Sequence, residues 1–327
     1  MGRPTPIIFA QVSAGSTSPC LCYDDGDPSS LQSIWQPVAN SLHRLSTAEP
    51  RYVVAALVLY IASLFIVGAR WRGFVRALGG NVSVPRATLA TLGGIAAGNL
   101  TPGRVGGEAC RIGLVRLSGT ATWRQATVAA VWDRLSELPP VLVLSLMALI
   151  GIRHLTSGWR APSIVVGVTV ALVLGGLAIG KIGRSGIGLT GWRERLASNR
   201  VPGRVFAMGV GYSSLLWFQD VLRLACATRA LGVILSPTQI ATLSMLAMLG
   251  GLVPSLAGLG PVEGGLLAGL MAFGIDLQTA AAVTAIERAI SYGFSTTAGA
   301  MVIALMGGRS LWGVVRGGQP PADMRET

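Results

Sequence analysis

The stretch NLTPGRVGGEACR, residues 99–111, decides how the rest of this chain is interpreted. It is a break rich in glycine and proline, and it carries Arg104, Glu108 and Arg111 between two apolar segments. A looser counterpart, GLVPSLAGLGPVEGG, occupies residues 251–265 and also has a glutamate near its end. We predict that these two breaks form the working centre and that the other helices hold them at membrane depth.

Proline and glycine are the residues expected to interrupt the helices at the two breaks. Proline removes a backbone donor and glycine tolerates conformations that other residues avoid, so both interrupt helices. The expected helix-breaking residues are Pro102, Gly103, Gly106 and Gly107 in the first break, and Pro254, Gly258 and Gly260 in the second.

The composition is that of an integral membrane protein. The 327 residues are 51% hydrophobic and only 12% charged, with a mean hydropathy of +0.59, whereas soluble domains carry about 25% charged residues. A bilayer requires the backbone to satisfy its hydrogen bonds internally, which predicts an all-α polytopic fold. The net charge of +12 is distributed between the apolar spans, which fits basic cytoplasmic loops and argues against nucleic-acid binding.

The apolar segments predict about five full crossings and two re-entrant hairpins. A crossing needs about 20 apolar residues, and the two short segments before the breaks therefore turn back within the membrane. The expected crossings are 52–69, 122–151, 164–180, 205–231 and 277–306. The expected hairpins pair 87–100 with 108–118, and 238–253 with 263–273.

The expected organisation is a polar N-terminal tail (1–50), a membrane domain (51–308) and a polar C-terminal tail (309–327). The basic loops at 70–86 and 181–204 fall on the same side as the C-terminal tail. By the positive-inside rule, we predict a multi-pass protein of the cell membrane with its C-terminus in the cytoplasm and its N-terminus outside.

The membrane domain reads as an inverted repeat with halves 52–151 and 205–306. Glu108 and Glu263 are 155 residues apart, and the pairs Asp133-Arg134 and Glu287-Arg288 are 154 apart. The single extra span between the halves inverts the second one. Inverted repeats with broken helices are typical of secondary transporters, although chance similarity of two loops in a chain with 44 glycines is the alternative.

Charged residues inside the predicted spans are the candidate site. Ionised side chains in a bilayer are costly and usually functional. The predicted substrate-binding residues are Arg104, Glu108, Arg111, Asp133, Arg134, Glu137, Asp220, Arg223, Glu263, Glu287 and Arg288. They either form a polar cavity for a charged headgroup or neutralise one another and pin the helices together.

Within this set, chemistry suggests separate roles. Arg104 and Arg111 beside a helix N-terminus would suit phosphate, because guanidinium groups and free backbone N–H groups both bind oxyanions. The carboxylates of Asp133, Glu137 and Glu287 could hold those arginines, or titrate and couple transport to protons.

The sequence contains no motif that indicates catalysis or cofactor binding. The sequence has no P-loop, nucleophile elbow or H-E-x-x-H, and its cysteines and histidines lack zinc-ligand spacing. We therefore predict no cofactor, no metal and no enzyme, with an intramembrane lipid-modifying enzyme as the open alternative.

The motifs NLTPGRVGGEACR and WDRLSEL, followed by GLGPVEGG and AIERAISY, resemble those of the lysylphosphatidylglycerol synthase transmembrane (flippase-like) family. The resemblance covers about 52–306. It implies a polytopic, oligomeric protein that moves or handles lipid headgroups. It places in the motif set Pro102, Gly103, Gly106, Gly107, Glu108, Arg111, Asp133, Arg134, Gly258, Gly260, Glu263 and Arg288.

Two departures from the family pattern matter. Members usually begin with an extra span, whereas residues 1–50 here are polar, and the chain carries no aminoacyl-transferase domain. Only the translocation half of that activity could carry over. We predict a flippase-like transporter of an anionic or phosphate-bearing lipid. The alternatives are a small-solute or ion transporter, and a non-catalytic partner of an envelope-lipid enzyme.

Overall fold

The computed structural model describes residues 43–101, 105–153, 201–252 and 260–315, and this part of the chain is helical without strands. The helices are α2 (Pro50–Ala77), α3 (Val84–Leu100), α4 (Val105–Leu117), α5 (Trp123–Arg153), α8 (Gly203–Arg229), α9 (Pro237–Leu252), α10 (Pro261–Ala272), α11 (Leu277–Arg288), the π-helix η1 (Ala289–Phe294) and α12 (Ser295–Val315). The all-α prediction is confirmed.

Three helical stretches are long and apolar enough to cross a membrane: Pro50–Ala77, Gly203–Arg229 and Leu277–Met306. The four short helices of the predicted hairpins begin and end within three residues of their expected bounds. Their re-entrant course stays a prediction. The expected crossing at 164–180 lies outside the described residues.

One boundary prediction was wrong. We expected the first span to end at residue 69 and residues 70–86 to form a basic loop, but α2 continues for two further turns to Ala77. Arg70 and Trp71 are buried in the interior rather than exposed at a membrane surface. The helix ends where Gly79 adopts a positive φ of 88°, a conformation that glycine adopts at little cost.

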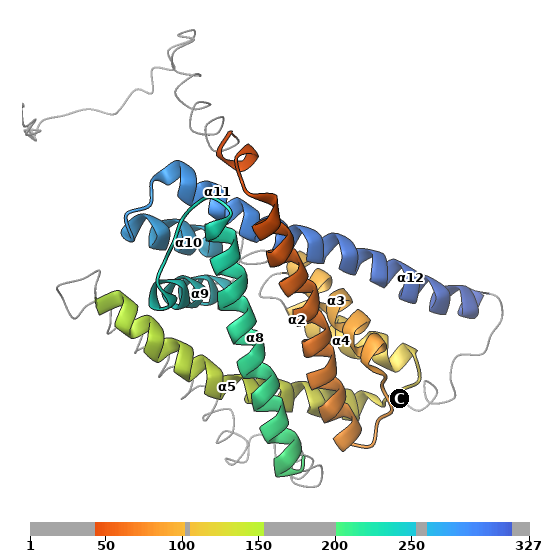
Figure 1. Cartoon of the computed structure of the whole chain (residues 1–327). Helices are drawn as coiled ribbons and strands as arrows, with labels where there is room; N and C mark the ends of the chain where they lie inside the picture. The colour runs from red at the N-terminus through yellow and green to blue at the C-terminus, as the bar shows by residue number, and fades with distance from the viewer. Residues whose placement is uncertain (1–42, 102–104, 154–200, 253–259, 316–327) are drawn as a thin grey trace, which may run out of the picture.

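Two long helices, α2 and α8, lie side by side at the centre of the molecule (Figure 1). The hairpin of α3 and α4 lies to one side of this pair, and the hairpin of α9 and α10 lies to the other. Each half also has its own apolar core. One core contains Trp71, Phe74 and Val115, and the other contains Leu243 and Leu270.

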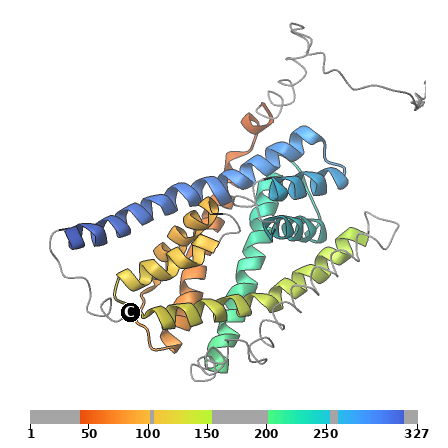
Figure 2. The ribbon, with the colours of Figure 1, turned by 180° about the vertical axis from the view of Figure 1, so that it is seen from behind.

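The remaining long helices connect the halves. Helix α5 follows α4 and packs against α9 of the other half, while α12 follows η1 and packs against α3 (Figure 2). The last helix of each half therefore packs against the hairpin of the other half.

The hairpins are tight because small residues let their backbones approach. A Cβ atom at Gly107 would lie 2.8 Å from the carbonyl oxygen of Gly94, and one at Gly250 would lie 2.5 Å from that of Pro261. Thr101, which ends α3, is extended (φ −116°, ψ 139°), as expected for a residue that precedes a proline.

This packing makes a prediction about Gly107→Ala. The added methyl group would press on backbone atoms that cannot rotate away, so we expect destabilisation of about 1–3 kcal/mol. Gly113→Ala on the same helix is the matched control, because nothing lies within 4 Å of its Cβ position. There we expect a neutral effect or a gain of up to about 1 kcal/mol from helix propensity. Thermal unfolding in detergent tests both, and equal effects would contradict the hairpin geometry.

The helical hydrogen bonding is interrupted shortly after the acid–arginine pair in α5, and again after the corresponding pair at the end of α11. Helix α5 contains Pro139 and Pro140, which cannot donate to the carbonyl groups one turn earlier. In the second half, the π-helix η1 begins directly after Arg288, and π turns also loosen the hydrogen-bond ladder. Each irregularity therefore adjoins the charged residues described next.

Candidate functional site

A cavity of about 1010 Å³ lies between the two halves, bounded by residues of α2, α4, α5, α8, α9, α10, α11 and η1. Its charged lining consists of Arg70, Glu108, Arg134, Glu137, Asp220, Arg223, Glu287 and Arg288. Four arginines thus face four carboxylates. The rest of the wall is mostly apolar, with Tyr60, Ser63, Trp217, Gln219, Ser244 and Ser291 as further polar or aromatic members.

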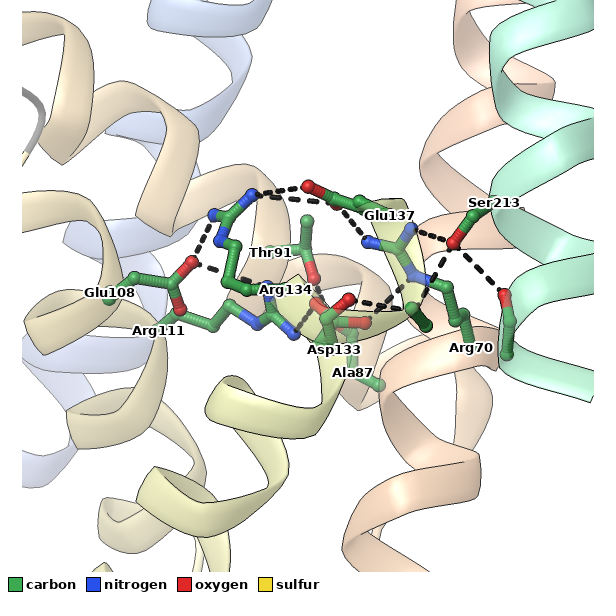
Figure 3. A network of polar contacts seen from close by, with 11 residues as sticks. Arg70, Ala87, Thr91, Glu108, Arg111, Asp133, Arg134, Glu137 and Ser213 are labelled. Carbon is green, nitrogen blue, oxygen red and sulfur yellow. Dashed lines mark hydrogen bonds and ion pairs between the residues drawn. The ribbon is translucent and has the colours of Figure 1, made fainter. Parts of the chain in front are cut away.

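Asp133 is the centre of the charged network of the first half (Figure 3). Its side chain is completely buried, and each carboxylate oxygen accepts from a different arginine. Nε of Arg70 lies 2.7 Å from Oδ1, and Nη2 of Arg111 lies 2.8 Å from Oδ2. The guanidinium of Arg111 also lies 4.0 Å above the Trp71 ring, a favourable cation–π geometry.

A second layer of ion pairs lies between Asp133 and the cavity. Arg70 also donates to Glu137 at 2.5 Å and to the Ser213 hydroxyl at 2.7 Å. Arg134 pairs with both Glu137 and Glu108. The side chain of Arg134 is 59% exposed, so it is the member of this network that a ligand could reach most easily.

The second half has a smaller charged network. Arg223 pairs with Asp220 one turn earlier on α8, and its Nη1 lies 2.6 Å from Oε1 of Glu287. Arg288 pairs with Glu263 at 2.6 Å through Nε. Glu263 also caps α10, because its Oε2 accepts from the backbone N–H of Gly260 at 2.7 Å.

Two ion pairs of the first network have a counterpart in the second. Glu108 with Arg134 corresponds to Glu263 with Arg288, and both are ion pairs. Arg70 with Asp133 corresponds to Arg223 with Glu287. The positions are separated by 153 to 155 residues throughout. These two pairs of matching contacts lie at the spacing on which the predicted repeat rests.

Comparison with known proteins agrees with the motifs. Residues 34–299 match the model of the lysylphosphatidylglycerol synthase TM region. The chain belongs to this family. It is also similar to a UPF0104 membrane protein of Methanothermobacter thermautotrophicus, with 28% identity over 80% of this chain and 88% of that protein. A UPF0104 membrane protein of Pyrococcus horikoshii is 22% identical over 82% of this chain and 91% of its own length.

In this family member, the predicted site residues fall into three groups. Seven line the cavity: Glu108, Arg134, Glu137, Asp220, Arg223, Glu287 and Arg288. Three do not line the cavity but pair with residues that do: Arg111, Asp133 and Glu263. Arg104 lies outside the described residues, as do Pro102, Gly103, Pro254 and Gly258. Gly106 and Gly107 lie in the first turn of α4, and Gly260 precedes α10 with a φ of 91°.

Arg70 is the site residue of this family member that sequence reasoning missed. It is 3% exposed, lines the cavity and pairs with two carboxylates. A signal was present, because Arg70 precedes Arg223 by 153 residues, close to the spacing of the other repeated pairs. Among the described residues, no group of three histidine, cysteine, aspartate or glutamate side chains is arranged to hold a metal ion.

Proposed function

We propose that this protein is a membrane transporter that moves the polar headgroup of a phosphate-bearing lipid across the cell membrane. The proposal includes an inverted repeat with five crossings and two re-entrant hairpins, so that the cavity lies near the bilayer midplane. The C-terminus is then cytoplasmic. Lipid acyl chains stay in the bilayer while the headgroup passes between the two halves.

The observation that carries the proposal is the charged cavity between the halves. A volume of about 1010 Å³ lies at the upper end of the ordinary range of small-molecule sites, which is about 300–1,000 Å³, and it accommodates a headgroup with its water. Charged residues from both repeats line it. Buried ion pairs alone would stabilise the helices without leaving such a space.

Two arginines are suited to receive phosphate. Arg288 uses Nε for Glu263, and its buried Nη2 has no hydrogen-bond partner. Arg134 exposes more than half of its side chain. A phosphate group accepts from guanidinium donors in a planar geometry that lysine cannot reproduce. We therefore infer that Arg134 and Arg288 contact the headgroup in turn as it crosses.

The apolar part of the wall favours a lipid over a free solute. Leu142 of α5 lines the cavity and is 39% exposed. Val143 and Leu146 continue that exposed apolar surface. A ligand with a polar head and an apolar body would match both surfaces at once.

Native mass spectrometry of the purified protein tests this function. We expect wild type to retain a phosphate-bearing lipid, and the Arg134→Ala/Arg288→Ala protein to lose it by at least about tenfold, or about 1.4 kcal/mol. Arg51→Ala is the matched control, because Arg51 is a surface arginine paired with Glu49. Retention of the same lipid by both variants would refute the assignment, and absence of any selective lipid would favour a solute transporter.

A further inference from the structure

The two charged networks are not equal in charge. In the first half, three arginines (Arg70, Arg111, Arg134) face three carboxylates (Glu108, Asp133, Glu137). In the second half, two arginines (Arg223, Arg288) face three carboxylates (Asp220, Glu263, Glu287). Among the described residues, the second network therefore lacks one arginine when all its carboxylates are ionised.

The repeat spacing identifies the position in the second half that corresponds to Arg111. Arg111 lies three residues after Glu108, and the residue three after Glu263 is Leu266. Its aromatic partner is replaced too, because Trp71, next to Arg70, corresponds to Leu224, next to Arg223. Leu224 and Leu266 are both buried and belong to the same apolar cluster. The second half thus has apolar packing where the first has a guanidinium stacked on a ring.

Glu287 is left incompletely partnered by this exchange. Its counterpart Asp133 accepts from two arginines, one at each oxygen. Glu287 has an ion pair with Arg223 at Oε1, while its buried Oε2 has no hydrogen-bond partner. The residue is 7% exposed and lines the cavity.

The groups around Glu287 come from every helix packed against it. Helix α8 contributes Asp220 and Arg223, α10 contributes Glu263, and α11 itself contributes Arg288. The ring of Tyr60 on α2 lies under Arg223, and the ring of Tyr292 on η1 lies under Arg288. Arg288 is engaged with Glu263, so Arg223 alone is shared by Glu287 and Asp220.

We propose that Glu287 is the proton-binding site that couples headgroup movement to a proton gradient. This inference rests on the proposed transport function and names its energy source. A proton from water in the cavity binds Oε2 of Glu287 and makes the carboxyl group neutral. Arg223 then pairs with Asp220 alone, and the second network becomes electrically balanced like the first.

The charge balance of the second network also explains how protonation of Glu287 acts on the same residues as an anionic headgroup. An uncompensated charge in a bilayer is costly, so ionised Glu287 favours a conformation that admits water or a cationic partner. Protonated Glu287 loses its attraction for Arg223 and favours the closed, apolar packing around Leu266. A cycle of proton binding and release can therefore drive the cavity between two states.

Infrared difference spectroscopy of the protein in lipid tests the proposal directly. A pH titration should show the C=O stretching band of one protonated carboxyl group appear in wild type as pH falls. We expect Glu287→Gln to lose that band and Glu287→Asp to keep one with a shifted midpoint. Asp133→Asn is the matched control and should keep the band, because each oxygen of Asp133 already accepts from an arginine.

Three outcomes would overturn the proposal: a band that persists in Glu287→Gln, a band that disappears in Asp133→Asn alone, or no titrating carboxyl in wild type. The spectra need no lipid movement, so they can succeed when a transport assay fails. A titrating Glu287 without lipid transport would refute the proposed function alone, and lipid transport with no titration at Glu287 would refute this inference alone.

Discussion

Asp133→Ala is expected to destabilise the protein by about 3–5 kcal/mol, the cost of breaking a buried ion pair by removing one partner. Two buried arginines, Arg70 and Arg111, each lose their hydrogen-bonded carboxylate oxygen. Glu137 still compensates Arg70, but the nearest remaining carboxylate to Arg111 is Glu108 at 3.7 Å. Thermal or denaturant unfolding in detergent micelles measures the effect.

The matched control for Asp133→Ala is Glu287→Ala at the equivalent place in the second half. Removal of Glu287 leaves Arg223 with Asp220, so no arginine is orphaned and the charge excess disappears. We expect a cost of less than about 1.5 kcal/mol, in the lower part of the range of about 0.5–3 kcal/mol that most single substitutions cost. Similar losses in the two variants would contradict the difference between the two networks.

Arg223→Leu is expected to have the second large effect, again about 3–5 kcal/mol. Arg223 is the shared partner of Asp220 and Glu287. Without it, two carboxylates of the cavity wall remain near each other and lose the arginine that both of them pair with. Unfolding measurements should therefore show a loss comparable to that of Asp133→Ala.

A second substitution separates charge from packing. Adding Glu287→Gln to Arg223→Leu removes one of the two uncompensated carboxylates and should recover half or more of the lost stability, a coupling within the range of about 0.5–3 kcal/mol seen for contacting residues. Glu263→Gln in the same background is the control, because Glu263 pairs with Arg288 instead. Equal recovery by both second substitutions would contradict the specific contact between Arg223 and Glu287.

Much of the architecture could be predicted from local sequence. Apolar segments and Gly/Pro breaks predicted the helices of both hairpins to within three residues, because hydropathy and helix-breaking residues act locally. The repeated glutamates and acid–arginine pairs could be found by spacing alone. These features depend on the chain near each residue and need no knowledge of distant contacts.

The contacts and burial of the site residues could be learned only from the tertiary structure. Arg70 was assigned to a loop because hydropathy falls at a cluster of arginines, yet burial of that arginine depends on Asp133, 63 residues away. The separation of cavity-lining residues from supporting ones is likewise a property of packing. Arg111 is as charged as Arg134, but it lies behind the wall, stacked on Trp71. A charged residue in a predicted span is a candidate site residue, but the sequence does not show whether its side chain faces the cavity or is buried behind the cavity wall.

The π-helix η1 is a further feature that local reasoning could not supply. The prolines at 139 and 140 are visible in the sequence, and they lie within one continuous helix, α5. Residues 289–294, which follow Arg288 at the corresponding place, contain no proline. In the structure, Tyr60 of α2 donates to the carbonyl of Ser291 within this π-helix at 3.4 Å, a contact between residues far apart in the sequence.

The central claim is that lipid headgroups cross the bilayer through the cavity between the two halves. Its most direct test is transbilayer movement of a headgroup-labelled anionic phospholipid in vesicles of phosphatidylglycerol and phosphatidylethanolamine that contain the purified protein. We expect the movement to be faster with the wild-type protein than in protein-free vesicles. With Arg288→Ala, we expect the protein-dependent rate to be at least about tenfold lower than with wild type, which corresponds to about 1.4 kcal/mol. Arg51→Ala should behave like wild type. Equal rates in wild-type and protein-free vesicles, or full activity in Arg288→Ala, would contradict the account.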